Sequence, residues 1–197
     1  MKTTKVLFYC TMGKPYLYKD VDNKFKLQNK EDANWINKHL LNGLNGKVVA
    51  ECEVETEEIR LSEYPYYTDT LTNDELLDKS CLDDDELDNY ITDKHAYALH
   101  IKNLKIFDNP KYIFDYYKRV KEFDISDSLA FMPVQKAPQN MMKVYDKEGN
   151  SYVVISIRSP WLCKIFNGEK EIEVRTKVMK EMLSNETNVK LVSKRKI

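Results

Sequence analysis

The stretch from residue 155 to residue 175, ISIRSPWLCKIFNGEKEIEVR, concentrates side chains that could bind a phosphate or a base. Its pattern predicts a strand, a short helix and a second strand, which would bring these side chains near one another. They are Arg158, Trp161, Lys170, Glu173 and Arg175. Guanidinium groups grip phosphate, an indole stacks on a base, and a carboxylate accepts from an exocyclic amine. The segment therefore predicts a nucleotide-recognition site. The alternatives are that Glu173 and Arg175 form an ordinary solvated salt bridge and that Trp161 packs in the core.

Four residues outside this stretch are further candidates for the same site. Lys14 and Tyr16 follow the first predicted strand and could approach the site from its loop, although Tyr16 could equally cover one end of a barrel. His100 and Asn103 lie on another predicted strand. Because side chains alternate along a strand, only one of these two is expected to face the site.

The secondary-structure elements expected around these residues are short. Strands are expected at 5–11, 47–59, 95–107, 141–145, 152–158, 170–175 and 188–192, and helices at 31–42, 109–122, 159–167 and 176–184. Ser159 is expected to cap the third of these helices with Pro160 in its first position, and a polar loop with Pro133 and Pro138 to precede 141–145. Imperfect alternation in 47–59 indicates a bulge or a tilted strand. This pattern predicts an α+β fold, a small β-barrel with short flanking helices in one domain over 1–197.

The stretch from residue 155 to residue 175 resembles the hallmark segment of the ASCH family, a branch of the PUA-like β-barrels. Gly168, Lys170, Glu173 and Arg175 match its G-x-K-x-x-E-x-R pattern position for position, and 155–160 matches the preceding strand and helix start. Stretches at 9–18, 45–54, 98–111 and 136–144 are similar to larger phage and bacterial members. The resemblance implies a PUA-like barrel that binds RNA, in single-stranded form, or a modified nucleotide in a cleft lined by the motif.

The resemblance also leaves hydrolysis open. Some family members hydrolyse acetylated cytidine with Lys, Thr and Glu, and another branch cleaves RNA. This chain keeps Lys170, but Glu173 stands where the hydroxyl nucleophile would be, and Thr176 is expected on the other strand face. The amidase reaction is therefore disfavoured, while Lys170 and Glu173 remain the catalytic candidates, with Glu173 as a general base.

The order of the motifs departs from the family. Members usually begin with the strand–helix–strand hallmark, whereas here 152–175 follows the other matching stretches. One interpretation is a circular permutation in which the turn at 146–151, DKEGNS, joins the family's usual ends. The other is exchange of the C-terminal segment between protomers, so both a monomer and a swapped dimer stay open.

The net charge of −1, from 31 basic and 32 acidic residues, is unevenly distributed. Residues 51–93 hold 16 acidic residues against two basic ones, so this segment carries −14 and the remainder +13. Because steering depends on local fields, the neutral total does not exclude a nucleic-acid ligand. Residues 60–94 are interpreted as an acidic insertion packed on the core, with short helices at 74–79 and 84–90. Three roles are open for this acidic insertion. It could be merely solvated, it could mimic nucleic acid and dock on a basic host protein as phage inhibitors do, or it could cover the basic cleft.

The cysteines and histidines favour neither a metal nor a cofactor. Cys10, Cys52, Cys81 and Cys163 are far apart, without a CxxC pair, and His95 and His100 fall on opposite faces of a predicted strand. Four unpaired thiols, no recognisable secretion signal and no apolar run of membrane-spanning length indicate a cytoplasmic protein without a membrane partner. Abundant Lys, Asn, Ile and Tyr are typical of the AT-rich genome of a Firmicute or its phage.

Overall fold

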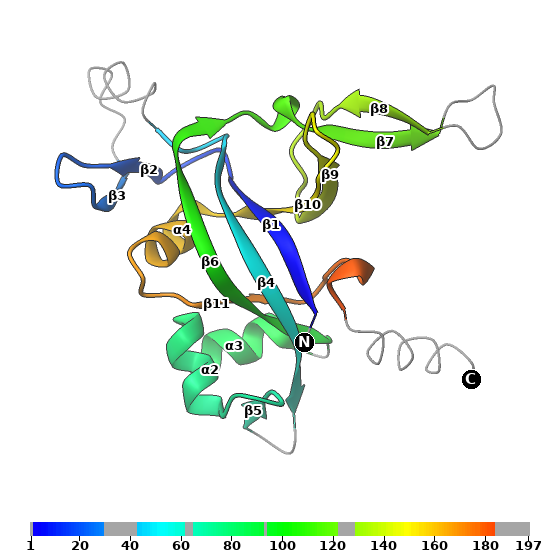
Figure 1. Cartoon of the computed structure of the whole chain (residues 1–197). Coiled ribbons are helices and arrows are strands. Elements are labelled where there is room, and N and C mark those ends of the chain that lie inside the picture. Colours follow the sequence, from blue (N-terminus) through cyan, green and yellow to red (C-terminus); the bar gives the residue numbers. More distant parts are fainter. Residues whose placement is uncertain (1, 30–42, 62–64, 93, 122–128, 184–197) are drawn as a thin grey trace. The chain divides into compact units, whose positions relative to one another are not determined.

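A computed structural model of the chain describes residues 2–29, 43–61, 65–92, 94–121 and 129–183 (Figure 1). They form two compact units. The first unit comprises the described residues within 1–4, 53–103 and 168–197, and the second those within 5–52 and 104–167. Two long strands, β4 (Val48–Leu61) and β6 (Ala96–Lys111), contribute residues to both units.

The strands of the second unit follow the order β6-β4-β1-β10-β9-β7-β8. Besides β4 and β6 they are β1 (Thr3–Cys10), β7 (Tyr117–Lys121), β8 (Leu129–Pro133), β9 (Met141–Tyr145) and β10 (Ser151–Ile157). β1 and β10 pair in parallel, and the pairs β10–β9, β9–β7 and β7–β8 are antiparallel. The parallel pair is made of the apolar runs VLFYC and VVISI, which is typical of strands covered on both faces.

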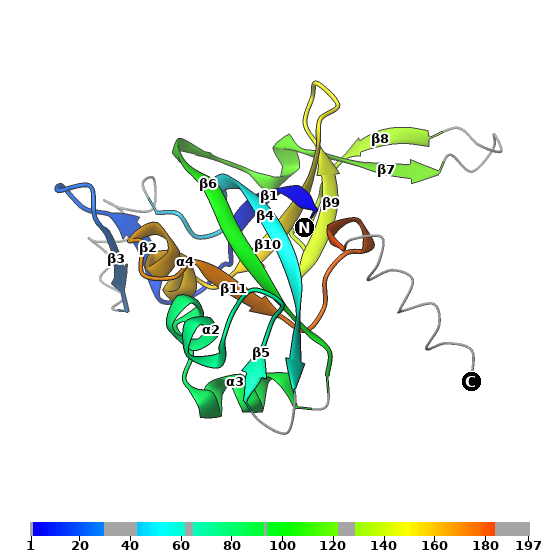
Figure 2. The same ribbon diagram turned by 60° about the horizontal axis from the view of Figure 1, so that its bottom comes forward.

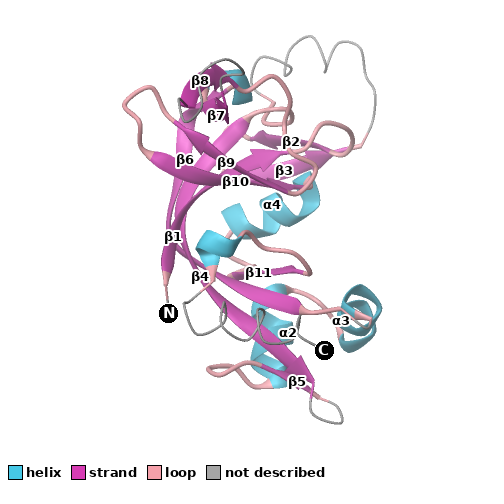
Figure 3. Cartoon of the chain, turned by 90° about the vertical axis from the view of Figure 1, so that its right-hand side faces the viewer, coloured by secondary structure: helices cyan, strands magenta, loops and turns pink. Residues whose placement is uncertain are grey.

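A buried cluster stabilises this unit and anchors the connection between β6 and β7. It contains Leu7, Tyr9, Val48, Ile113, Tyr116, Val134, Val144 and Val154. Helix α4 (Ser159–Phe166) packs against a separate hairpin of β2 (Tyr16–Lys19) and β3 (Phe25–Gln28) (Figure 3). The rings of Phe25 and Phe166 meet edge to face at 4.9 Å, and the Asn167 amide exchanges hydrogen bonds with the Phe25 backbone.

The first unit combines a sheet in the order β5-β4-β6-β11 with two helices (Figure 2). Its further elements are β5 (Tyr66–Tyr67), α2 (Asn73–Ser80), α3 (Asp84–Ile91), β11 (Ile172–Arg175) and a 3-10 turn, η2 (Lys180–Met182). The two helices are those predicted, and each begins with a reciprocal capping box: Thr72 with Glu75, and Asp83 with Glu86.

The interpretation of 60–94 as an insertion packed on a core, rather than part of it, is wrong. Leu76, Leu87 and Ile91 from the two helices are buried in one cluster with Ile172 and Val174 of β11. The helices look polar in sequence because α2 buries only one apolar residue, Leu76, and α3 only two, Leu87 and Ile91, while most of their other residues are polar or charged. The acidic segment therefore supplies half of this core.

The helix predicted at 109–122 is also wrong. β6 continues to Lys111, a 3-10 turn η1 (Ile113–Asp115) follows, and β7 begins at Tyr117. Asn109-Pro110 satisfies the rule for a helix start, but the residues after it are rich in aromatic and β-branched side chains, which favour strands. Four of these aromatic residues therefore lie on a strand or a turn instead of a helix.

Several smaller predictions also need correction. Arg158, not Ser159, is the N-cap of α4, because the Ser159 hydroxyl donates to the Pro15 carbonyl at 2.5 Å. Of the helix expected at 176–184, the described residues 176–183 form only the single turn η2; β8 lies where a polar loop was expected, and β2 and β3 were not predicted. The helix at 31–42 and the strand at 188–192 lie outside the described residues.

The α+β class and the strands at 5–11, 47–59, 95–107, 141–145, 152–158 and 170–175 are confirmed. The burial pattern of β4 shifts by one residue between Glu55 and Glu57, as an extra residue in a bulge would cause. The pairing order of the described strands has two ends, β11 and β8, so a closed barrel stays a prediction. Among the described helices, none has the length and apolar character needed to cross a membrane.

Candidate functional site

The hallmark strand β11 pairs with β6 at one edge of the first unit's sheet. Glu173 lies opposite Leu99 and Arg175 opposite Tyr97, so these four side chains share one face of the sheet. Ile172 and Val174 occupy the other face, in the core cluster. The side chains of β11 thus alternate between the two faces, but Glu173 is not on a solvated face: it is only 7% exposed.

Lys170 is buried to the same degree, with 3% of its surface exposed. Its Nζ donates to the carbonyl of Ser80 at 2.5 Å and lies 3.5 Å from Oε2 of Glu173. Ser80 is the last residue of α2, where the helix macrodipole is negative and carbonyls lack helical partners. Lys170 therefore caps the C-terminus of α2, and the adjacent amide of Glu171 does the same by donating to Lys79 O at 2.8 Å.

Arg175 completes an ion triad around Glu173. Its Nε lies 2.9 Å from Oε1 of Glu173, while the other carboxylate oxygen faces Lys170. The sequence prediction that Lys170, Glu173 and Arg175 come together is confirmed in their geometry. Because removing one member of a buried ion set leaves an uncompensated charge, the triad is held in place as a unit.

His100 does not share the face of Glu173. It lies opposite Ile172, and its Nε2 is 2.8 Å from Oε2 of Glu57. The same oxygen accepts from the hydroxyls of Thr68 and Thr70, each at 2.8 Å. Burial opposes ionisation of Glu57, but the hydrogen bonds from the two threonines and His100 outweigh it and hold its pKa below the ordinary value. Glu57 is a buried acceptor of several hydrogen bonds, and simple strand alternation does not predict its burial because β4 changes phase just before it.

Asn103 forms a surface hydrogen bond within the same unit. It has a positive φ of 51°, which interrupts strand alternation, and its Nδ2 donates to Oε2 of Glu53 at 2.6 Å on the exposed surface.

The remaining candidates belong to the second unit. Lys14 is exposed, and Tyr16 begins β2 after a loop whose carbonyls accept from the Asn45 amide. Arg158 is exposed at the N-cap of α4. Trp161 is half-buried, with Nζ of Lys164 5.1 Å from its ring centroid. The nine predicted site residues thus divide between the two described units. The triad, His100 and Asn103 belong to the first unit, and Lys14, Tyr16, Arg158 and Trp161 belong to the second.

A second cluster of aromatic and basic side chains, not predicted from sequence, lies on β7, β8 and β9. Arg119 and Phe131 are directly paired across β7 and β8, and the Arg119 guanidinium carbon lies 5.2 Å from the Phe131 centroid. It lies 4.7 Å from the Tyr145 centroid, and the two rings meet edge to face at 5.2 Å. Tyr145 is buried beneath this contact, whereas Phe131 is 49% exposed. We call Arg119, Phe131, Lys143 and Tyr145 the β7–β9 face.

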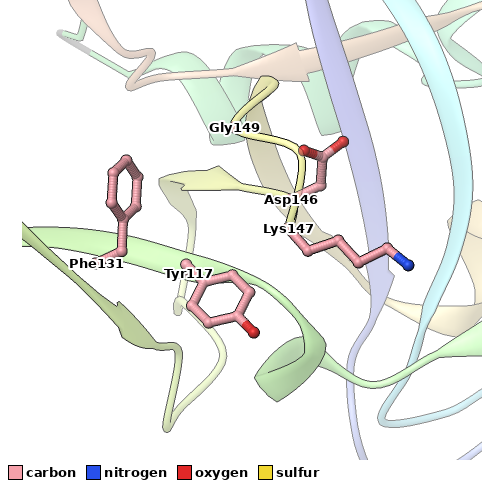
Figure 4. Close-up of a pocket in the computed structure, with 5 residues that line it drawn as sticks. All are labelled: Tyr117, Phe131, Asp146, Lys147 and Gly149. Carbon is pink, nitrogen blue, oxygen red and sulfur yellow. The ribbon is translucent and has the colours of Figure 1, made fainter.

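A cavity of about 220 Å³ borders the β7–β9 face (Figure 4). Its lining comprises Tyr117, Phe131, Asp146, Lys147 and Gly149, the last three from the predicted turn between β9 and β10. Burial opposes ionisation of Asp146, but hydrogen bonds from Asn150, Glu148 and Tyr152 outweigh it and lower its pKa. Asp146 therefore organises the turn, and the rings of Tyr117 and Phe131 supply the apolar surface of the cavity.

The three strands carry only basic charges, whereas the turn at the cavity adds Asp146 and Glu148 beside Lys147. β7, β8 and β9 together contain four basic residues and no acidic one, and Nζ of Lys143 lies 5.9 Å from the Tyr145 centroid. The signal in the sequence is the adjacency of aromatic and basic residues in YYKRVK, followed by the apolar LAFMP. It was missed because one segment was interpreted as a helix and the other as a loop.

In the described part of the chain, no three His, Cys, Asp or Glu side chains are grouped as a metal site would require. No protein-family model, curated protein or solved structure matches the chain.

Proposed function

We propose that the chain binds single-stranded RNA, or a nucleotide, on the β7–β9 face. The observation that carries the proposal is the half-exposed ring of Phe131 beside the guanidinium of Arg119. Aromatic rings on a sheet stack on bases, and nearby cations bind the backbone, whatever the base sequence. A guanidinium above a ring keeps its in-plane N–H groups for phosphate oxygens.

The size of the cavity suits a single nucleobase rather than a larger ligand. Its volume of about 220 Å³ is below the roughly 300–1,000 Å³ of pockets that enclose drug-sized molecules. Its lining combines the rings of Tyr117 and Phe131 with Lys147, the carboxylate of Asp146 and Gly149, a size and composition that suit a single flat base. The resemblance to the ASCH family supports the same ligand class, but at the hallmark strand.

The hallmark residues are assigned a supporting role in this proposal. Lys170 is committed to the end of α2 and Glu173 to two cations, so a ligand would have to displace buried contacts to reach them. For the same reason we propose binding without hydrolysis. The proposal includes the finer architecture, a PUA-like barrel, and a cytoplasmic location, which the four free cysteines support.

The test is fluorescence anisotropy with a labelled ten-nucleotide oligouridylate over a range of salt concentrations. Each phosphate contact contributes about −0.7 to the slope of log K against log salt, so Arg119→Gln should weaken binding and make the slope shallower by about 0.7. The matched control is Lys79→Gln, which removes a positive charge from the first unit and should leave affinity and slope unchanged. Equal affinity and slope for wild type and Arg119→Gln would overturn the proposal.

A further inference from the structure

A second aromatic pair lies on the second unit, outside the β7–β9 face. The rings of Tyr112 and Phe114 stack with their centroids 5.0 Å apart and their planes 5° from parallel. Their exposed fractions are 48% and 58%, the latter among the largest of any aromatic side chain in the described residues. This pair therefore presents a parallel aromatic stack to solvent.

The stack stands on a fixed base. Ile113, which lies between Tyr112 and Phe114 in sequence, is buried in the core cluster with Tyr116. The core therefore anchors the turn η1. The amide of Tyr112 donates to Oδ2 of Asp115 at 3.0 Å, and the amide of Asp115 donates to Tyr112 O at 3.1 Å. Rings held in this way lose little conformational entropy when a flat ligand stacks on them.

Two lysines lie near the stack in space or in sequence, and the stack's own turn adds one carboxylate, that of Asp115. Nζ of Lys47 lies 6.0 Å from the Tyr112 centroid, and Nζ of Lys111 lies 5.2 Å from that of Phe107, earlier on β6. Neighbouring ammonium groups fit a polyanion with flat bases better than they fit an apolar protein surface. The charge thus favours nucleic acid as the occupant.

The stack also continues into the β7–β9 face along the chain. Phe114 and Tyr117, which lines the cavity, are three residues apart, so their Cα atoms are at most about 11 Å apart. Between them Tyr116 is buried, and its carbonyl accepts from the amide of Val134 at 2.8 Å, directly after β8. The two aromatic surfaces therefore share one rigid support.

We propose that the Tyr112–Phe114 stack is a second base-stacking site for the same RNA strand that occupies the β7–β9 face. This inference rests on the proposed function and adds a footprint: a strand of about four or more nucleotides is needed to reach both aromatic surfaces, at the lower end of known site sizes. We expect a dinucleotide to be too short to occupy both surfaces at once.

The test compares oligouridylates of two and ten nucleotides by anisotropy, with Phe114→Ala, Phe114→Leu and Phe131→Ala. Losing one stacked base should cost at least about fivefold in affinity. We expect Phe131→Ala to weaken both oligomers, and Phe114→Ala to weaken only the longer one. Phe114→Leu keeps the apolar area without the ring and should behave like the alanine variant. Tyr90→Ala, an exposed aromatic on acidic α3, is the control and should bind normally.

The possible failures are distinguishable. If Phe131→Ala weakens binding but Phe114→Ala does not affect the longer oligomer, the second site is wrong and the proposed function stands. If Phe114→Leu binds like wild type, the surface is merely apolar and the stacking inference is wrong. If Phe114→Ala abolishes self-association or capture of a protein without affecting RNA, the stack is a protein interface. If wild type binds neither oligomer, both proposals fall.

Discussion

Replacing Glu173 by glutamine tests whether the ion triad holds the first unit together. The substitution preserves shape but removes the charge that lies 2.9 Å from Nε of Arg175 and 3.5 Å from Nζ of Lys170. Breaking a buried ion pair by removing one partner costs about 3–5 kcal/mol. Lys170 keeps the Ser80 carbonyl and the negative end of α2, and a favourable charge at a helix end contributes up to about 2 kcal/mol. We therefore expect the free energy of unfolding to fall by about 2–4 kcal/mol.

The assay is urea unfolding followed by circular dichroism, with a fall in the midpoint at unchanged m. In thermal unfolding, each kcal/mol lost should lower Tm by about 2–4 °C for a chain of this size. Glu171→Gln on the same segment is the control, because the Glu171 carboxylate is mostly exposed, 3.8 Å from Lys79, and should change stability by less than about 0.5 kcal/mol. If Glu173→Gln were as stable as this control, the triad would not be structural and its residues would again be the leading ligand site.

Two further predictions concern buried titratable groups. Because the pKa of Glu57 is lower in the folded chain than in the unfolded chain, its ionised form stabilises the fold at neutral pH, and this contribution is lost as the pH falls through the folded pKa. Urea midpoints should therefore decline below about pH 5, and less steeply in Glu57→Gln; parallel declines would contradict this role of Glu57. Burial raises the pKa of Cys10 to about 12, so a thiol reagent at pH 8 should label Cys81 and Cys163 in the native chain and reach Cys10 and Cys52 only after denaturation. Rapid labelling of Cys10 in the native chain would contradict its burial.

Sequence reasoning succeeded where one local rule decides the structure. The turn at Asp146 forms as expected, since its carboxylate accepts from the amides of Glu148 and Asn150 and Gly149 has a φ of 86°. The apolar runs of β1 and β10 and the alternation of β11 are equally direct signals.

It failed where tertiary contacts overrode the local signal. Asn109-Pro110 fits a helix start, yet the segment after it is extended because Ile113 and Tyr116 are buried in the core cluster. The burial of Lys170 was unpredictable without the end of α2, which is ninety residues away in sequence. The spacing of Lys170, Glu173 and Arg175 correctly grouped them, but it carried no information on whether their charges face solvent or one another.

We propose that RNA lies on the β7–β9 face and not against β11. Photo-crosslinking of an oligonucleotide containing 4-thiouridine, with the attachment site located by mass spectrometry, tests this most directly because it needs no variant. We expect crosslinks within 112–121 and 129–147, foremost at Tyr117 and Phe131. Crosslinks confined to 158–175, at Arg158, Trp161 or Arg175, would contradict it.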